Sequence, residues 1–112
     1  MRSHNARRKF EMFNRRYWDG ALTVPEIVVI PAGMQGRLMS RCADWGAYGE
    51  LDGKLTIELR ALDGYVHKTY LNANLLHEMI HHRIGLQHAH NSRKFRNEVR
   101  RISGLGALIE VI

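Results

Sequence analysis

The sequence predicts an α+β fold in which an N-terminal helix precedes a small β-sheet and two further helices. Three observations predict this order. Apolar residues recur with helical spacing over residues 4–18 and again from residue 69 onward. The segment between them holds short strand-like apolar runs separated by Gly, Pro and Asp-Gly turn signals. The 112 residues suffice for one domain and are too few for two, so we expect a single domain over residues 1–112.

The first helix is expected over residues 4–18. Phe10, Phe13 and Tyr17 lie at i, i+3 and i+7 and form one apolar face, while most of the basic side chains lie elsewhere. An Asp-Gly pair directly after this segment is a typical helix stop.

Three strands are expected between the helices. Glu26–Ile30 is a β-branched apolar run enclosed by two prolines. Residues 37–43 form a second strand candidate, with residues 48–51 as an extension of it. An Asp-Gly hairpin turn then leads into residues 54–59, where apolar and polar side chains alternate.

Two helices are expected in the C-terminal part. The first covers residues 69–85 and ends at a glycine. Asn91 or Ser92 caps the next helix, and Gly104 ends it. The apolar tail, residues 105–112, is expected either to add a last strand or to pack on the core.

A His-Glu-x-x-His motif lies inside the second helix. Four residues advance a helix by about 400°, so His77 and His81 share one face and can bind one metal ion. Glu78 can reach a zinc-bound water without binding zinc, and can act as a general base. The motif therefore predicts a hydrolytic zinc site, and the alternative is a pair of core histidines without a metal.

A catalytic zinc site needs a third protein ligand. The metzincin pattern is excluded, because its glycine and third histidine each miss by one residue here. His90 is favoured, since it lies just before the cap of the third helix, which can pack back over the site. His88 and His67 remain alternatives, and Glu98 is a weaker one because it lies two turns into that helix.

Two further residues have simpler interpretations. His82 points about 100° away from His81 round the helix, so we expect it at the surface or supporting a ligand. Cys42, the single cysteine, excludes a disulfide within the chain and is expected as a buried small residue of the second strand. The N-terminus lacks an apolar stretch of signal-peptide length and no run approaches a membrane span, so we expect a cytoplasmic, intracellular protein.

The charge is basic at both ends. The net charge is +6 and the sequence pI is near 10.0. Residues 1–18 and 83–101 each carry six basic groups against one acidic group, whereas residues 19–82 carry five basic and eight acidic ones. This pattern suits a polyanion, so DNA is an expected partner through the basic residues of 2–16 and 93–101. The alternative is a soluble basic protein with no such partner.

Several segments carry a family likeness in their order and spacing. They are FNRRYWDGAL at 13–22, IVVI at 27–30, a strand ending at Arg41-Cys42, TIEL at 56–59, LLHEMIHH at 75–82 and HNSRKFR at 90–96. Together they span roughly residues 10–103 and resemble the SprT-like family, which includes the Spartan proteases. Two features depart from that family: the spacing from His90 to Phe95 is one residue longer than usual, and the cysteine-rich zinc ribbon of many members is absent.

The resemblance implies a zincin-like minimal metalloprotease domain of the kind that phages carry, which would place it in a host cytoplasm. It implies zinc held by His77, His81 and a third histidine, with Glu78 as the catalytic base. It also implies an endopeptidase acting near DNA, with DNA–protein crosslinks as the substrate class. Two other functions remain open: a DNA-binding module with a structural or inactive zinc site, and a zinc hydrolase of a non-peptide bond.

Overall fold

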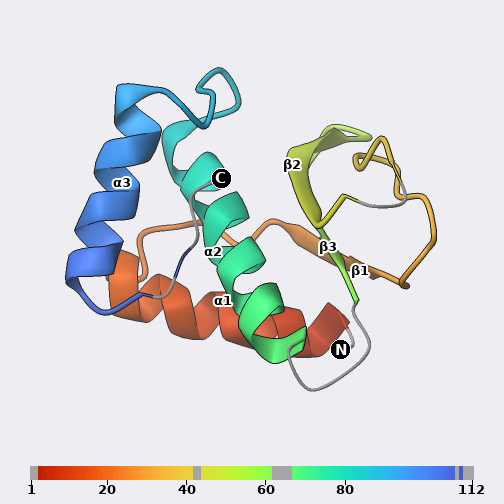
Figure 1. Ribbon diagram of the computed structural model, residues 1–112, viewed down its shortest axis with the longest axis horizontal. Coiled ribbons are helices and arrows are strands. Elements are labelled where there is room, and N and C mark those ends of the chain that lie inside the picture. Colours follow the sequence, from red (N-terminus) through yellow and green to blue (C-terminus); the bar gives the residue numbers. More distant parts are fainter. Residues whose placement is uncertain (1–2, 42–43, 62–66, 108, 110–112) are drawn as a thin grey trace.

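Three helices and a three-stranded sheet make up the described part of the chain. The computed structural model describes residues 3–41, 44–61, 67–107 and 109. Its elements, in chain order, are α1 (Ser3–Trp18), β1 (Glu26–Ile30), β2 (Gly46–Leu51), β3 (Lys54–Arg60), α2 (His67–Ile84) and α3 (Arg93–Gly104). The sheet lies to one side of α2, α3 lies to the other side, and α1 crosses beneath them (Figure 1). The predicted α+β class is confirmed.

Helix α1 forms where the apolar spacing predicts it. Phe10, Phe13 and Tyr17 are buried and join the core that α1 shares with α2 and β1. The helix ends because the two residues after it adopt positive φ angles of 52° and 78°. The side chain of Asn14 then fixes the exit: its amide donates to the Leu22 carbonyl at 2.9 Å and its oxygen accepts from the Leu22 N–H at 3.0 Å.

The sheet has the order β1-β3-β2. Strand β1 runs parallel to β3, with Ile27 opposite Ile57. Strand β2 runs antiparallel to β3, with Tyr48 opposite the same Ile57. The predicted Asp-Gly turn joins β2 to β3, since Asp52 and Gly53 have φ angles of 51° and 78°, as a tight hairpin turn requires.

The predicted second strand over residues 37–43 is wrong for its described part. Residues 37–41 form an irregular loop, and Cys42 and Ala43 lie outside the described residues. The strand that pairs with β3 is β2, which takes in the predicted extension over residues 48–51.

The loop departs from strand geometry because the Glu58 side chain binds its backbone. The N–H groups of Arg37, Leu38 and Met39 each donate to the Glu58 carboxylate at 2.9 Å. Gly36 precedes them, and a Cβ atom there would collide with the same carboxylate. These N–H groups are therefore unavailable for a β-ladder.

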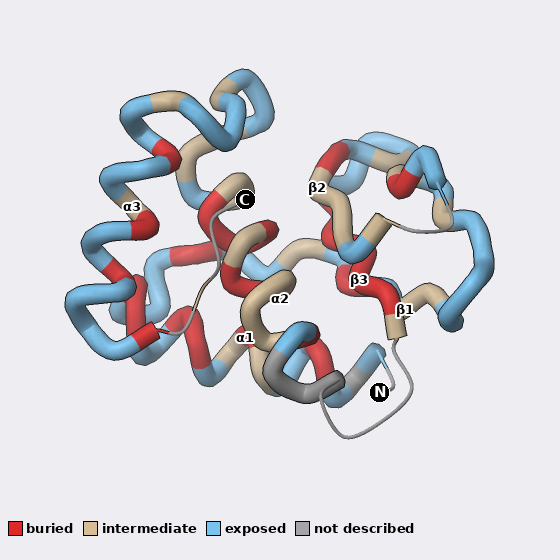
Figure 2. The backbone as a smooth tube through the Cα atoms, in the orientation of Figure 1, coloured by how far each residue is buried: buried red, intermediate tan, exposed pale blue. Residues whose placement is uncertain are grey.

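Arg60 binds the same loop through its carbonyl oxygens. The guanidinium donates to the backbone oxygens of Pro31, Met34, Arg41 and Asp44, at 2.6 to 3.3 Å. Residues 56–60 of β3 are all buried, because the loop covers the face that carries Glu58 and Arg60 while the helices cover the face that carries Ile57 and Leu59 (Figure 2).

The two C-terminal helices close the core. Helix α2 begins at His67, two residues before the predicted start, and contributes the buried side chains Leu71, Leu75, Leu76, Met79 and Ile80. Helix α3 has Ser92 as its N-cap, which accepts from the Phe95 N–H at 3.2 Å. Its buried face consists of Phe95, Val99 and Ile102, as the apolar spacing predicts.

The described part of the tail packs on the core instead of forming a strand. Ala107 is buried, and Ile109 packs against the same cluster. None of the described helices has both the length and the hydropathy needed to cross a lipid bilayer.

Candidate metal centre

The packing of helix α2 determines which way the side chains of the predicted His-Glu-x-x-His motif point. Leu76, Met79 and Ile80 are buried against the core, which turns the side of α2 that carries His77 and His81 toward a cleft. The two imidazole rings lie 5.1 Å apart between centroids. One helical turn separates them, as the His-Glu-x-x-His spacing predicts.

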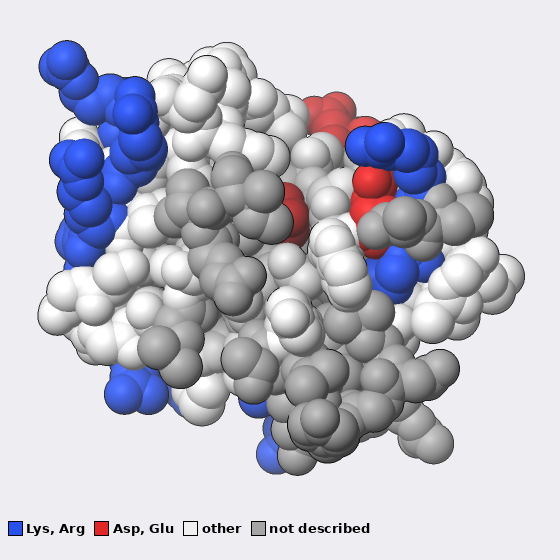
Figure 3. Space-filling view, in the orientation of Figure 1, with Lys and Arg blue, Asp and Glu red and all other residues white. Residues whose placement is uncertain are grey.

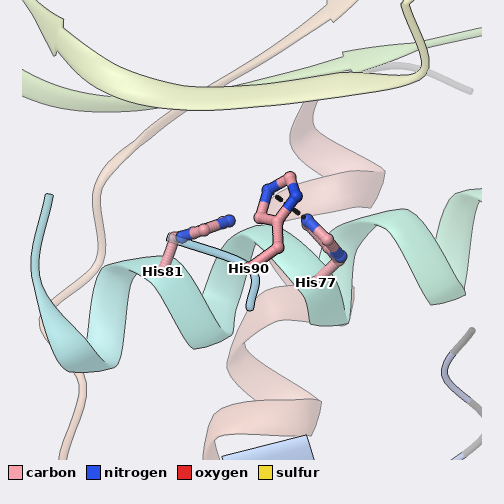
Figure 4. Close-up of side chains that lie close together, drawn as sticks. All are labelled: His77, His81 and His90. Atoms are coloured by element: carbon pink, nitrogen blue, oxygen red, sulfur yellow. Dashed lines mark hydrogen bonds between the residues drawn. The ribbon is translucent and has the colours of Figure 1, made fainter. Parts of the chain in front are cut away.

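The third histidine of the cluster is His90. Its ring centroid lies 4.5 Å from that of His77 and 4.7 Å from that of His81. The Nε2 atoms of His77 and His90 are 3.1 Å apart. Figure 4 shows the three rings turned toward one another, two from α2 and one from the segment before α3. Each residue offers a ring nitrogen within 4.8 Å of the others, so the cluster can bind a metal ion.

The turn between α2 and α3 explains how His90 reaches the cluster. Gly85 has a φ of 103° and ends α2, and the chain returns through a turn in which the Ser92 N–H donates to the Ala89 carbonyl at 3.0 Å. Phe95, fully buried in the first turn of α3, then contacts all three imidazoles, with centroid distances of 5.0, 4.8 and 5.4 Å. Its apolar ring therefore packs against all three histidines and helps to hold them in place.

The other ligand candidates lie elsewhere or are not described. His88 lies outside the cluster and lines a smaller pocket of about 200 Å³ beside His81. The Glu98 carboxylate accepts from Trp18 Nε1 at 2.8 Å and from Arg101 at 3.0 Å, so it supports the packing of α3 on α1. The side chain of His67 is outside the described residues.

Burial keeps the α2 histidines neutral. It lowers the pKa of His77 to about 4, with smaller contributions from the neighbouring His90 and His81. It also lowers the pKa of His81 to about 4, helped by His90. A neutral imidazole has the free lone pair that a metal requires, so both side chains are in the ligand form at pH 7.

Glu78 is a buried carboxylate with no hydrogen bond from any described residue. Its relative exposure is 6%, and burial raises its pKa to about 8. The carboxylate lies against Gly46, where a Cβ atom would be 3.1 Å from Oε2. A carboxyl group with a pKa near 8 can both accept and donate a proton near neutral pH.

The cluster opens on a cleft of about 680 Å³. Its lining combines His77, Glu78 and His90 with the start of β2 and the first half of α2. The remaining lining residues are Arg41, Asp44, Trp45, Gly46, Tyr70, Ala73 and Asn74. A ligand in this cleft would lie between the sheet and α2, in contact with His77, His90 and Glu78.

Tyr48 is a residue near the site that sequence reasoning missed. His82 Nε2 lies 2.6 Å from the Thr23 carbonyl, which can only accept, so this nitrogen carries the proton. His82 Nδ1 therefore accepts from the Tyr48 hydroxyl at 2.8 Å. The half-buried His82 ring ties α2 to β2 and to the exit of α1, and among the described residues its hydrogen bonds reach none of the three clustered histidines. The Tyr48 contact crosses 34 residues of sequence, and no local pattern points to it.

Comparison with models of protein families, with curated proteins and with solved structures gave no significant match. The function is therefore inferred from the three histidines, Glu78 and the cleft.

Proposed function

We propose that this chain is a zinc-dependent endopeptidase of the SprT-like type. His77, His81 and His90 hold the zinc ion, and Glu78 acts as the general base. One observation carries the proposal: three imidazoles converge at the wall of an open cleft, with a buried carboxylate beside them that has no hydrogen bond from the described residues.

The donor set fits zinc. Zinc–nitrogen bonds of 2.0–2.1 Å at a tetrahedral ion place two ligand nitrogens about 3.3 Å apart. The Nε2 atoms of His77 and His90 are 3.1 Å apart, close to this value. Three protein ligands leave a fourth position open, which is typical of catalytic rather than structural zinc.

In the proposed reaction, zinc and the residues around it have separate roles. Zinc held by three histidines supplies Lewis acidity, which activates water at neutral pH and polarises a peptide carbonyl. Glu78 takes the proton from the attacking water and returns it to the amine that leaves. The position of Gly46 leaves room for the Glu78 carboxylate, and Phe95 holds the imidazoles in place.

The first test compares the wild type with Glu78→Gln. We expect one zinc per chain in both proteins and cleavage of casein or of a DNA-binding protein in the wild type alone, with a loss of at least about 100-fold in the variant. Zinc content is measured beside proteolysis, with and without single-stranded DNA. Absence of zinc would refute the metal site, and equal activity in both proteins would refute the role of Glu78.

A second test identifies the third ligand. His90→Ala is expected to weaken zinc binding at least about 100-fold, because a three-ligand site is reduced to two. His88→Ala is the matched control, since His88 lies outside the cluster, and its zinc affinity is expected to stay within about threefold of the wild type. Competition with a chromogenic chelator measures both. The reverse result would make His88 the ligand.

A second candidate function is a DNA-binding module with a structural or inactive zinc site, and one surface favours DNA contact. Lys and Arg side chains gather along α3 (Figure 3). They are the exposed Arg93, Lys94, Arg96, Arg100 and Arg101. Among these five, only Arg101 forms an ion pair with a described residue, namely Glu98 at 3.0 Å. The free cations can bind phosphates, and salt-sensitive DNA binding without Glu78-dependent turnover would favour the module over the enzyme.

A further inference from the structure

Two exposed aromatic side chains stack on each other in the cleft that His77 and Glu78 also line. The rings of Trp45 and Tyr70 lie 5.8 Å apart between centroids and are inclined by 18°. Their relative exposures are 46% and 43%. They come from separate parts of the chain, one just before β2 and the other from the first turns of α2. An exposed pair of this kind contributes little to the core, so its contacts remain available to a ligand.

The aromatic pair lines the same cleft as the candidate catalytic residues, and Tyr70 is about 10 Å from His77 along α2. Trp45 and Tyr70 line the same 680 Å³ cleft as His77 and Glu78. Tyr70 and His77 are seven residues apart, so they share one face of α2 and are separated by about 10 Å along its axis. An extended peptide covers that distance with about three residues.

The backbone at Trp45 is held firmly. The Trp45 carbonyl accepts from the Arg60 N–H at 3.0 Å, and the Arg60 side chain binds the carbonyl of the preceding Asp44 at 2.6 Å. The ring is therefore presented to the cleft from a fixed backbone. Rigid aromatic side chains of this kind bind ligands with little loss of conformational entropy.

The charges of the cleft favour a peptide over a nucleic acid. Arg41 is the one cation of the described lining, and it pairs with Asp44 at 3.5 Å. The unpaired cations that could bind phosphates lie on α3, so a polynucleotide has no free cationic partner among the described residues of the cleft.

We propose that Trp45 and Tyr70 form a specificity subsite that binds an aromatic or large apolar side chain of the peptide substrate, about three residues from the bond that is cleaved. The proposal rests on the proposed peptidase function and adds the class of sequence that the enzyme selects.

Binding to the zinc-loaded Glu78→Gln protein tests the subsite without hydrolysis. The probe is a short peptide with one nitrophenylalanine, which quenches the exposed Trp45 more than Trp18, whose exposure is 6%. We expect saturable quenching. The dissociation constant should rise about tenfold in Tyr70→Ala, and about tenfold when alanine replaces the nitrophenylalanine in a competing peptide. Tyr70→Phe restores binding, and the exposed Leu105→Ala is the matched control.

The outcomes separate the two proposals. Equal affinity in Tyr70→Ala, or no saturable quenching, would overturn the subsite. Tighter competition by an oligothymidine than by the peptide would also overturn it, because the pair would then bind bases. Tyr70-dependent peptide binding with no hydrolysis by the wild type keeps the subsite and overturns the peptidase. If the rate of hydrolysis is unchanged in Tyr70→Ala and when the aromatic side chain of the substrate is replaced by alanine, the peptidase proposal stands and the subsite is overturned.

Discussion

Two buried carboxylates on different elements have opposite surroundings. Glu58, on β3, is 2% exposed and accepts three backbone N–H groups from the loop before β2. Glu78, on α2, is 6% exposed and accepts none from the described residues. Each lies against a glycine, Gly36 for Glu58 and Gly46 for Glu78. The first carboxylate organises the fold, whereas the second is buried without such partners, at some cost in stability.

The largest effect is expected from Glu58→Ala. The substitution leaves three N–H groups without their acceptor and opens a gap under the loop, so the free energy of unfolding should fall by about 3–5 kcal/mol. Urea denaturation measures it. Glu50→Ala is the matched control, because Glu50 lies on β2 with an exposed side chain, and its effect should stay within about 0.5 kcal/mol. A similar effect of both substitutions would show that the Glu58 contacts contribute little.

The Glu58 contacts also explain why one part of the fold could not be predicted from the sequence. The helices and the strands β1 and β3 follow from apolar spacing, and α3 also from its Ser92 cap. Residues 37–43 look like a strand locally, but the N–H groups of residues 37–39 bind the Glu58 carboxylate, about 20 residues later in the chain. Burial of the polar side chains on β3 depends on this long-range contact, so alternation in the sequence does not reveal it.

The candidate site likewise has features that the sequence predicts and contacts that only the structure shows. Helical spacing predicts that His77 and His81 share a face, and the cap at Ser92 favours His90 over His88. The stacked Trp45 and Tyr70 are 25 residues apart in sequence and belong to no local pattern, so only the structure brings them to the cleft.

A second, smaller effect is expected from Glu78→Gln in the zinc-free protein. The Glu78 pKa is about 8 in the folded chain against an ordinary value of 4.5, so folding takes up a proton between these values. The stability of the wild type therefore falls as the pH rises from 4.5 to 8, whereas glutamine does not titrate. At pH 8 the variant should be more stable by about 3–4 kcal/mol, and below pH 4.5 the difference should vanish.

Urea denaturation of the zinc-free proteins at several pH values measures this difference. The lowered pKa values of His77 and His81 destabilise both proteins as the pH falls from 6.5 toward 4, so their contribution cancels in the comparison. Glu50→Gln, on an exposed side chain, should show no such pH dependence. A pH-independent difference for Glu78→Gln would mean that the carboxylate is already ionised in the folded chain.

The smallest effect on stability, with a larger one on activity, is expected from Gly46→Ala. The new Cβ atom would lie 3.1 Å from Glu78 Oε2 and 3.2 Å from the Glu58 backbone oxygen. The backbone oxygen has little freedom, so the Glu78 side chain must move by a few tenths of an ångström, and the free energy of unfolding should fall by about 1 kcal/mol. Proteolysis should fall by about tenfold, because the proposed base Glu78 is displaced from its position.

Zinc content and denaturation are measured beside proteolysis in this variant. Gly104→Ala is the matched control: a Cβ atom there meets nothing within 4 Å, so stability and activity should both stay near the wild type. Because Gly46 touches Glu78 and none of the three histidines is among the nearest atoms to its Cβ, zinc binding should be unchanged. Loss of zinc together with activity would place the effect on the metal site as a whole, whereas loss of activity alone would assign it to the position of the carboxylate.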